Sequence, residues 1–112
     1  MPRQSVINQR EVTANGTIQV RISKQVIDDG EIISSEWHRT AFAPGDDFEG
    51  TISRVNAHLV QMKYGAVSTD EWDKVRAMIA VEQTPEVIQA YQAALAAERA
   101  ARDLELSGGA GA

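Results

Sequence analysis

The chain contains no cysteine and few aromatic residues. Without cysteine it has no disulfide framework, no thiolate nucleophile and no zinc–thiolate site. Its aromatic residues are two tryptophans, two tyrosines and two phenylalanines among 112 residues. Because so few large side chains are available, we expect each of them to mark a core or an interface position.

The chain also lacks a long apolar run and a cluster of basic residues. Met1-Pro2-Arg3-Gln4-Ser5 opens no such run, so we expect neither a secretory signal nor membrane insertion. The formal net charge is −5, and Arg39 is the only Lys or Arg between Asp28 and Glu49. A surface that binds phosphates needs clustered Lys and Arg, so we expect no nucleic acid partner.

Two dipeptides, Asn15-Gly16 and Asp29-Gly30, are typical of hairpin turns, which need positive φ. The residues from Ile18 to Val26 between them alternate apolar and polar, as in a half-buried strand, and only Lys24 breaks the alternation. We therefore predict an antiparallel β-meander over residues 1–43, which ends at Pro44-Gly45 because proline cannot donate to a sheet.

The strand register follows from keeping the apolar side chains together. A three-residue loop, Ala14-Asn15-Gly16 with Gly16 as a left-handed bulge residue, pairs Val12 with Ile18. A two-residue turn at Asp29-Gly30 gives one apolar face from the pairs Val26–Ile33, Ile22–Trp37 and Ile18–Ala41. The register leaves Arg21, Glu36 and His38 on the other, polar face.

Helical spacing follows the sheet. Ile52, Val55, Leu59 and Met62 predict a short amphipathic helix that stops near Gly65. Ser68-Thr69-Asp70-Glu71 is a capping box that opens a second helix, whose apolar stripe consists of Trp72, Val75, Met78 and Ile79.

Thr84-Pro85-Glu86 starts the last helix, with Thr84 as N-cap and Pro85 in the first helical position. The helix is amphipathic at first and then alanine-rich. We expect one α+β domain over residues 1–106: a three-stranded antiparallel meander, then two or three helices over 51–106. Residues 107–112 are rich in glycine and predict a disordered tail.

Chemical motifs are scarce. The only histidines are His38 and His58, and neither has convergent partners in the predicted elements, so a solvated role is favoured over metal binding or acid–base work. The acidic clusters at 28–31 and 46–49 lack the ligand spacing of a calcium loop. No nucleophile elbow, phosphate loop or dinucleotide motif occurs. We expect no enzyme activity, no catalytic or metal-binding residues and no cofactor.

Features suited to protein–protein contact are clearer. A three-stranded sheet has two edges, either of which can accept a strand from a neighbour. The candidate interface residues are Trp37, Trp72, Tyr91 and Leu95, although core positions are the favoured interpretation of both tryptophans.

Three stretches resemble small proteins encoded among phage and prophage tail genes. They are residues 15–21 (NGTIQVR), Trp37-His38-Arg39 leading into Pro44-Gly45-Asp46-Asp47, and residues 84–91 (TPEVIQAY). Where Trp37 stands, that group usually has tyrosine, and the segment 51–83 is longer here. The resemblance implies a structural component of the virion and carries over no catalytic residue.

The expected function is therefore a structural part of a phage tail, at the tail tip, baseplate or fibre attachment, made in the host cytoplasm. It implies other phage structural proteins as partners and several copies of this chain in the assembly. Two alternatives stay open. One is a soluble adaptor, an assembly chaperone or a host-interaction module; the other is an enzyme built around His38 or His58.

Overall fold

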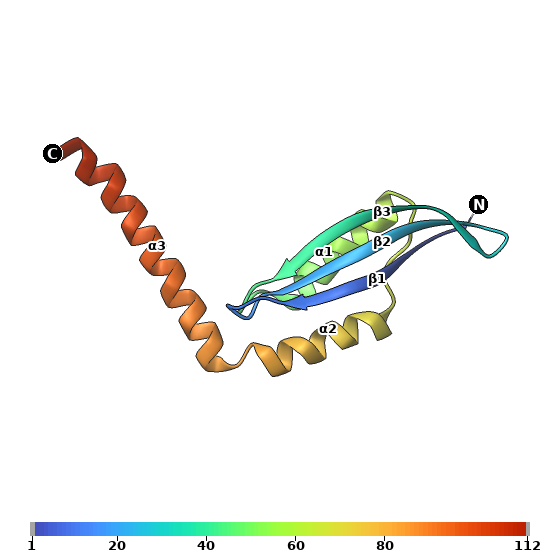
Figure 1. The fold of residues 1–112 in the computed structure, drawn as a ribbon, viewed down its shortest axis with the longest axis horizontal. Helices are drawn as coiled ribbons and strands as arrows, with labels where there is room; N and C mark the ends of the chain where they lie inside the picture. Colours follow the sequence, from blue (N-terminus) through green and yellow to red (C-terminus); the bar gives the residue numbers. More distant parts are fainter. Residues whose placement is uncertain (1, 112) are drawn as a thin grey trace.

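The computed structural model describes the backbone of residues 2–111 and the side chains of residues 2–106. Three strands come first: β1 (Arg3–Val12), β2 (Ile18–Asp28) and β3 (Glu31–Phe42). Three helices follow: α1 (Phe48–Gln61), α2 (Thr69–Glu82) and α3 (Pro85–Gly111). The strands form an antiparallel sheet in the order β1-β2-β3, so the predicted α+β meander followed by helices is confirmed (Figure 1).

The first hairpin has the predicted loop. Val12 pairs with Ile18, and the Thr13 amide donates to the Thr17 carbonyl oxygen over 2.9 Å, which leaves three residues in the loop. Gly16 adopts φ +91°, where a side chain would be strained. A Cβ at Gly16 would lie 2.5 Å from Cγ1 of Val87. Glycine therefore serves both the turn and the close approach of α3.

The second hairpin has the predicted two-residue turn but not the predicted register. Asp28 pairs with Glu31 around Asp29-Gly30, whose φ angles of 54° and 80° suit a tight turn. The register shifts next to Ile33, since Ile27 pairs with Ile32 and Val26 with Ser34. Beyond the shift, the observed pairs are Ile22–His38 and Ile18–Phe42 rather than Ile22–Trp37 and Ile18–Ala41.

The shift exchanges the two faces of β3, and its cause is a competition between aromatic residues. Phe42 and Trp37 are an odd number of positions apart, so they point to opposite faces of the strand. Phe42 takes the core, where its ring centroid lies 4.9 Å from that of Phe48 and 6.1 Å from that of Trp72. Trp37 and Ile33 consequently lie in solvent, 48% and 51% exposed, and their predicted burial is wrong.

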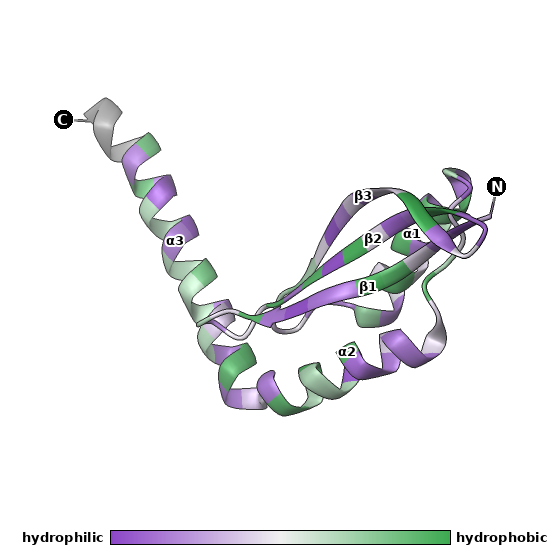
Figure 2. Ribbon diagram, turned by 45° about the vertical axis from the view of Figure 1, so that its right-hand side comes forward, coloured by the Kyte–Doolittle hydropathy of each residue, from purple (hydrophilic) through white to green (hydrophobic). Residues whose placement is uncertain are grey.

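The core lies between one face of the sheet and the helices α1 and α2. It contains sheet residues Ile18, Val20, Ile22 and Phe42, together with Val55, Leu59, Val67, Trp72 and Val75. Figure 2 shows both helices on the same side of the strands. Within residues 2–111, no helix covers the opposite face of the sheet.

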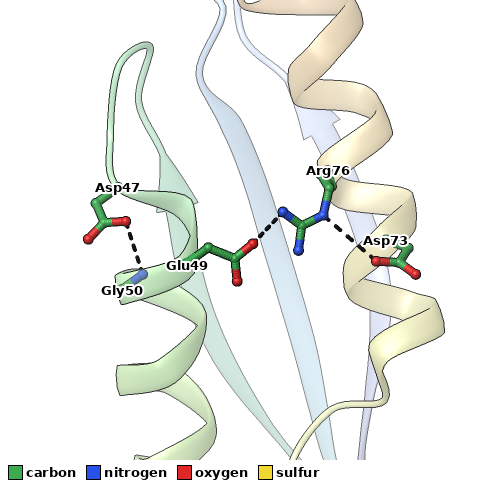
Figure 3. Close-up of polar contacts among 5 residues, drawn as sticks. All are labelled: Asp47, Glu49, Gly50, Asp73 and Arg76. Carbon is green, nitrogen blue, oxygen red and sulfur yellow. Dashed lines mark hydrogen bonds and ion pairs between the residues drawn. The ribbon is translucent and has the colours of Figure 1, made fainter.

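Caps and an ion pair fix the two covering helices. Asp47 accepts a hydrogen bond from the Gly50 amide at the start of α1, and Ser68 accepts one from the Glu71 amide at the start of α2. The predicted N-cap Ser68 is thus confirmed, and the Glu71 carboxylate reaches back to the Ser68 hydroxyl, 3.3 Å away, and to the Ile7 amide. Arg76 of α2 joins Glu49 of α1 and lies 3.8 Å from Asp73 (Figure 3). This exposed bridge ties the two helices together beside the sheet.

The last helix leaves the body of the molecule. Thr84 caps it as predicted, with its Oγ1 3.3 Å from the Val87 amide. The helix projects beyond the sheet, and the longest dimension of the molecule is 66 Å (Figure 1). The helix ends at Gly111. The predicted disordered tail covers residues 107–112, whose side chains lie outside the described part, and it stays a prediction.

Candidate interaction surfaces

The uncovered face of the sheet centres on Trp37. This face carries Arg21, whose guanidinium carbon lies 4.3 Å from the centroid of the Trp37 ring. The Nε of Arg21 also donates to Oδ1 of Asn8 over 3.0 Å. Asn8 is the unpaired residue at the bulge of β1. Asn8 of β1 thus holds Arg21 of β2, and Arg21 lies over the half-exposed indole of Trp37 on β3. A cation over an indole ring is an attractive pair, so Trp37 is both exposed and positioned.

A hollow with a mixed polar and apolar lining continues this face. It has a volume of about 450 Å³ and is lined by Gln9, Glu11, Gln19, Val20, Arg21, Arg39, Thr40 and Ala41. Its polar side chains are two amides, one carboxylate, one hydroxyl and two guanidinium groups, without a histidine or a nucleophile paired to a base. Hydrogen-bonding groups beside an exposed tryptophan are typical of protein-binding surfaces.

The two histidines lie together on the helix-covered face. His38 is half-buried on β3, and its ring centroid lies 5.3 Å from that of His58 on α1. The predicted position of His38 on the polar face is wrong, because the register shift moves it opposite Ile22. Burial, then His58, then Lys24 lower the pKa of His38, since each disfavours its protonated form.

The histidine pair has a lysine among its neighbours. Lys24, which also lowers the pKa of His38, is paired with Glu36 at 3.5 Å. Among the residues whose side chains are described, no three or more His, Asp or Glu groups are placed to hold a metal ion. The pair therefore suits a contact between α1 and β3 whose strength depends on protonation.

A second surface lies where α3 leaves the body. A groove of about 490 Å³ is lined by the first hairpin loop, Glu82 and one side of α3, including Tyr91 and Leu95. Both of these side chains are half-buried. The groove places these two predicted interface residues together, which their spacing of four on a helix already indicated.

Gln83 fixes the root of α3. Its Nε2 donates to the carbonyl oxygens of Gly16 and Phe42, at 2.9 and 2.7 Å. One side chain thus binds the loop of the first hairpin and the end of β3 just before the helix begins. The sequence contains no pattern that singles out Gln83, because its two acceptors are backbone atoms distant along the chain.

The predicted interface residues separate in the structure. Trp72 is only 3% exposed and its Nε1 donates to Oδ1 of Asn56 over 3.2 Å, so it is a core residue and not an interface anchor. Trp37 lies on the open sheet face, and Tyr91 and Leu95 lie in the groove. Arg21, which holds Trp37, was not among the candidates; it shares a face with Trp37 only because the register of β3 shifts next to Ile33.

No helix in the described part of the chain combines the length and apolar character needed to cross a membrane. Comparison with protein-family models, with curated proteins and with solved structures finds no match.

Proposed function

We propose that this protein is a structural component of a phage tail, at the tail tip, baseplate or fibre attachment, and acts through protein–protein contacts. The observation that carries the proposal is α3. This helix is clamped at its root by Gln83, yet every described side chain from Ala96 to Leu106 is exposed. A long helix held away from its own body presents its surface to another molecule.

Two parts of the molecular surface expose apolar side chains. Leu104 and Leu106 are each 75% exposed near the far end of α3, and Trp37 is half-exposed on the sheet. Exposed apolar side chains gain free energy when a partner covers them. The resemblance of residues 15–21, 37–47 and 84–91 to phage tail-region proteins favours structural proteins of the virion as those partners.

The proposal is tested with phage particles in which the gene for this chain is intact or disrupted. We expect mass spectrometry of purified particles to detect the protein, and disruption to give defective tails and lower infectivity. A matched variant that ends at Ala96 keeps the sheet and core but removes the exposed part of α3. We expect this variant to be made at normal levels and to be missing from the particle.

Two outcomes would contradict a virion component. Full infectivity of the disrupted phage, with no protein in the particle, would remove the tail role altogether. Defective tails whose particles lack the protein would indicate an assembly chaperone instead, which acts during assembly and is then released.

A further inference from the structure

The two edges of the sheet differ in how they are protected. At the β1 edge, the Ile7 amide donates to Oε1 of Glu71 on α2 over 2.8 Å. The strand is also bulged at Asn8, which interrupts a regular row of backbone groups. Both features are known means of preventing another strand from adding to an edge.

The β3 edge has little such protection. Among the hydrogen bonds that side chains make in the described part of the chain, none reaches the backbone of residues 31–41; the one to this strand, from Gln83, lies at its last residue. The register shift of β3 lies beside its turn, and residues 34–42 are regular. Ile32, Ile33 and Trp37 are each about half exposed. A long regular edge with exposed apolar side chains is suited to receive a strand.

The sequence of β3 is complementary to itself in one antiparallel register. When Trp37 lies opposite Trp37 of a second copy, Glu36 lies opposite His38 of that copy, and Ser35 opposite Arg39. Directly opposed residues share a face of the sheet, so these contacts are cross-strand pairs. A two-fold axis at Trp37 makes each heterotypic pair occur twice.

Neighbouring registers are worse. Sliding by two residues one way sets Glu36 against Glu36, which are like charges. Sliding by two the other way sets His38 against His38 and separates the two indoles. A slide by one residue would turn the apolar face of one copy toward the open face of the other. Charge and face alternation therefore select the register centred on Trp37.

We infer that β3 is a homotypic edge: two copies of this chain join their β3 strands antiparallel about Trp37 and form one continuous six-stranded sheet. The inference deepens the proposed function by naming the occupant of the edge, and it leaves α3 of each copy free for other partners. The two Arg21–Trp37 pairs then lie side by side on the open face.

The test uses the purified full-length chain, whose lack of cysteine makes single cysteines unambiguous. We expect light scattering to give twice the chain mass, falling to the chain mass on dilution. Trp37→Lys places two like charges on the axis and should weaken the dimer at least about tenfold, as expected for an interface hot spot. Trp37→Phe is the matched control and should retain the dimer.

Cross-linking tests the register with Trp37 intact. A mixture of the Ser35→Cys and Arg39→Cys chains should oxidise to a mixed disulfide dimer, because these positions oppose each other. Arg10→Cys, on the β1 edge, should remain monomeric under the same conditions. A wild-type chain that is monomeric at all concentrations would overturn the inference, as would a dimer that cross-links through Arg10→Cys and not through the mixed pair.

The test of the β3 dimer and the test of the tail role can fail independently of each other. A β3 dimer formed by a protein that the phage particle lacks would leave this inference standing while removing the proposed function. A tail component that is monomeric in solution would do the reverse.

Discussion

At the scale of single residues, the neighbours of His38 determine its pKa. His38 lies between the sheet and α1, with His58 beside it and Lys24 on the neighbouring strand. All three influences on its pKa, burial foremost, disfavour the charged imidazolium. The folded protein therefore prefers neutral His38.

The sign of the resulting pH dependence follows from linkage. The folded pKa of His38 is below its ordinary value of 6.5, so its contribution to stability is complete above that pH. The contribution is lost as pH falls through the lowered folded pKa. We expect the free energy of unfolding to decrease between pH 7.5 and 5 more in the wild type than in His38→Gln, as measured by urea unfolding.

The variant His58→Gln supplies a control with a separate readout. It removes one cause of the shift and leaves burial in place, so a nuclear magnetic resonance titration should show the pKa of His38 rising but remaining below the ordinary value. An unchanged pKa in this variant would show that the two rings do not interact.

At the scale of elements, the junction between α2 and α3 determines where the last helix points. Gln83 precedes the Thr84 cap and holds two carbonyl oxygens from separate parts of the sheet. A buried carbonyl that loses its donor is destabilising, and here one side chain satisfies two. Gln83 thus fixes the angle between α2 and α3, although the sequence predicts only that a helix ends there.

Replacing Gln83 should make the junction between α2 and α3 more mobile. We expect Gln83→Ala to destabilise the fold by about 1–3 kcal/mol, because two partly buried carbonyl oxygens lose their donor. Spin labels at Gln19→Cys and Ala97→Cys should give a broader distance distribution than in the parent. Gln89→Ala, an exposed glutamine on α3, is the matched control and should change neither quantity. Equal distributions for both variants would show that other contacts orient the helix.

At the scale of the whole molecule, the fold divides into a packed body and a projecting arm. The core residues come from β2, the end of β3, α1, α2 and the segment before α2, and none of the described side chains of α3 is among them. The arm meets the body in its first turns, where Val87 lies near Gly16 and Ile88 near Gly45. Folding of the body and placement of the arm are therefore nearly independent.

A chain that ends at Ala96 tests this division. Because the described side chains removed are all exposed, we expect the free energy of unfolding to stay within about 0.5 kcal/mol of the intact protein, by urea unfolding. The helical signal in circular dichroism should fall in proportion to the residues lost. A large loss of stability would instead mean that the arm packs on the body in solution.

The sequence by itself determined what depends on neighbours along the chain. Both turns, the bulged loop at Gly16, the Ser68 and Thr84 caps and the apolar face of β2 follow from local backbone preferences and strand alternation. The amphipathic start of α3, on which Tyr91 and Leu95 lie, was likewise predicted from residue spacing, and both side chains are half-buried.

Only the tertiary structure decided which face of β3 turns inward. Only one face of β3 packs on the helices, so Trp37 and Phe42 cannot both be buried, and the choice depends on Phe48 of α1 and Trp72 of α2. That choice sets His38 beside His58, frees Trp37 for the open face and leaves the β3 edge complementary to itself. The direction of α3 was equally out of reach, because the carbonyl oxygens that hold Gln83 become neighbours only when the chain has folded.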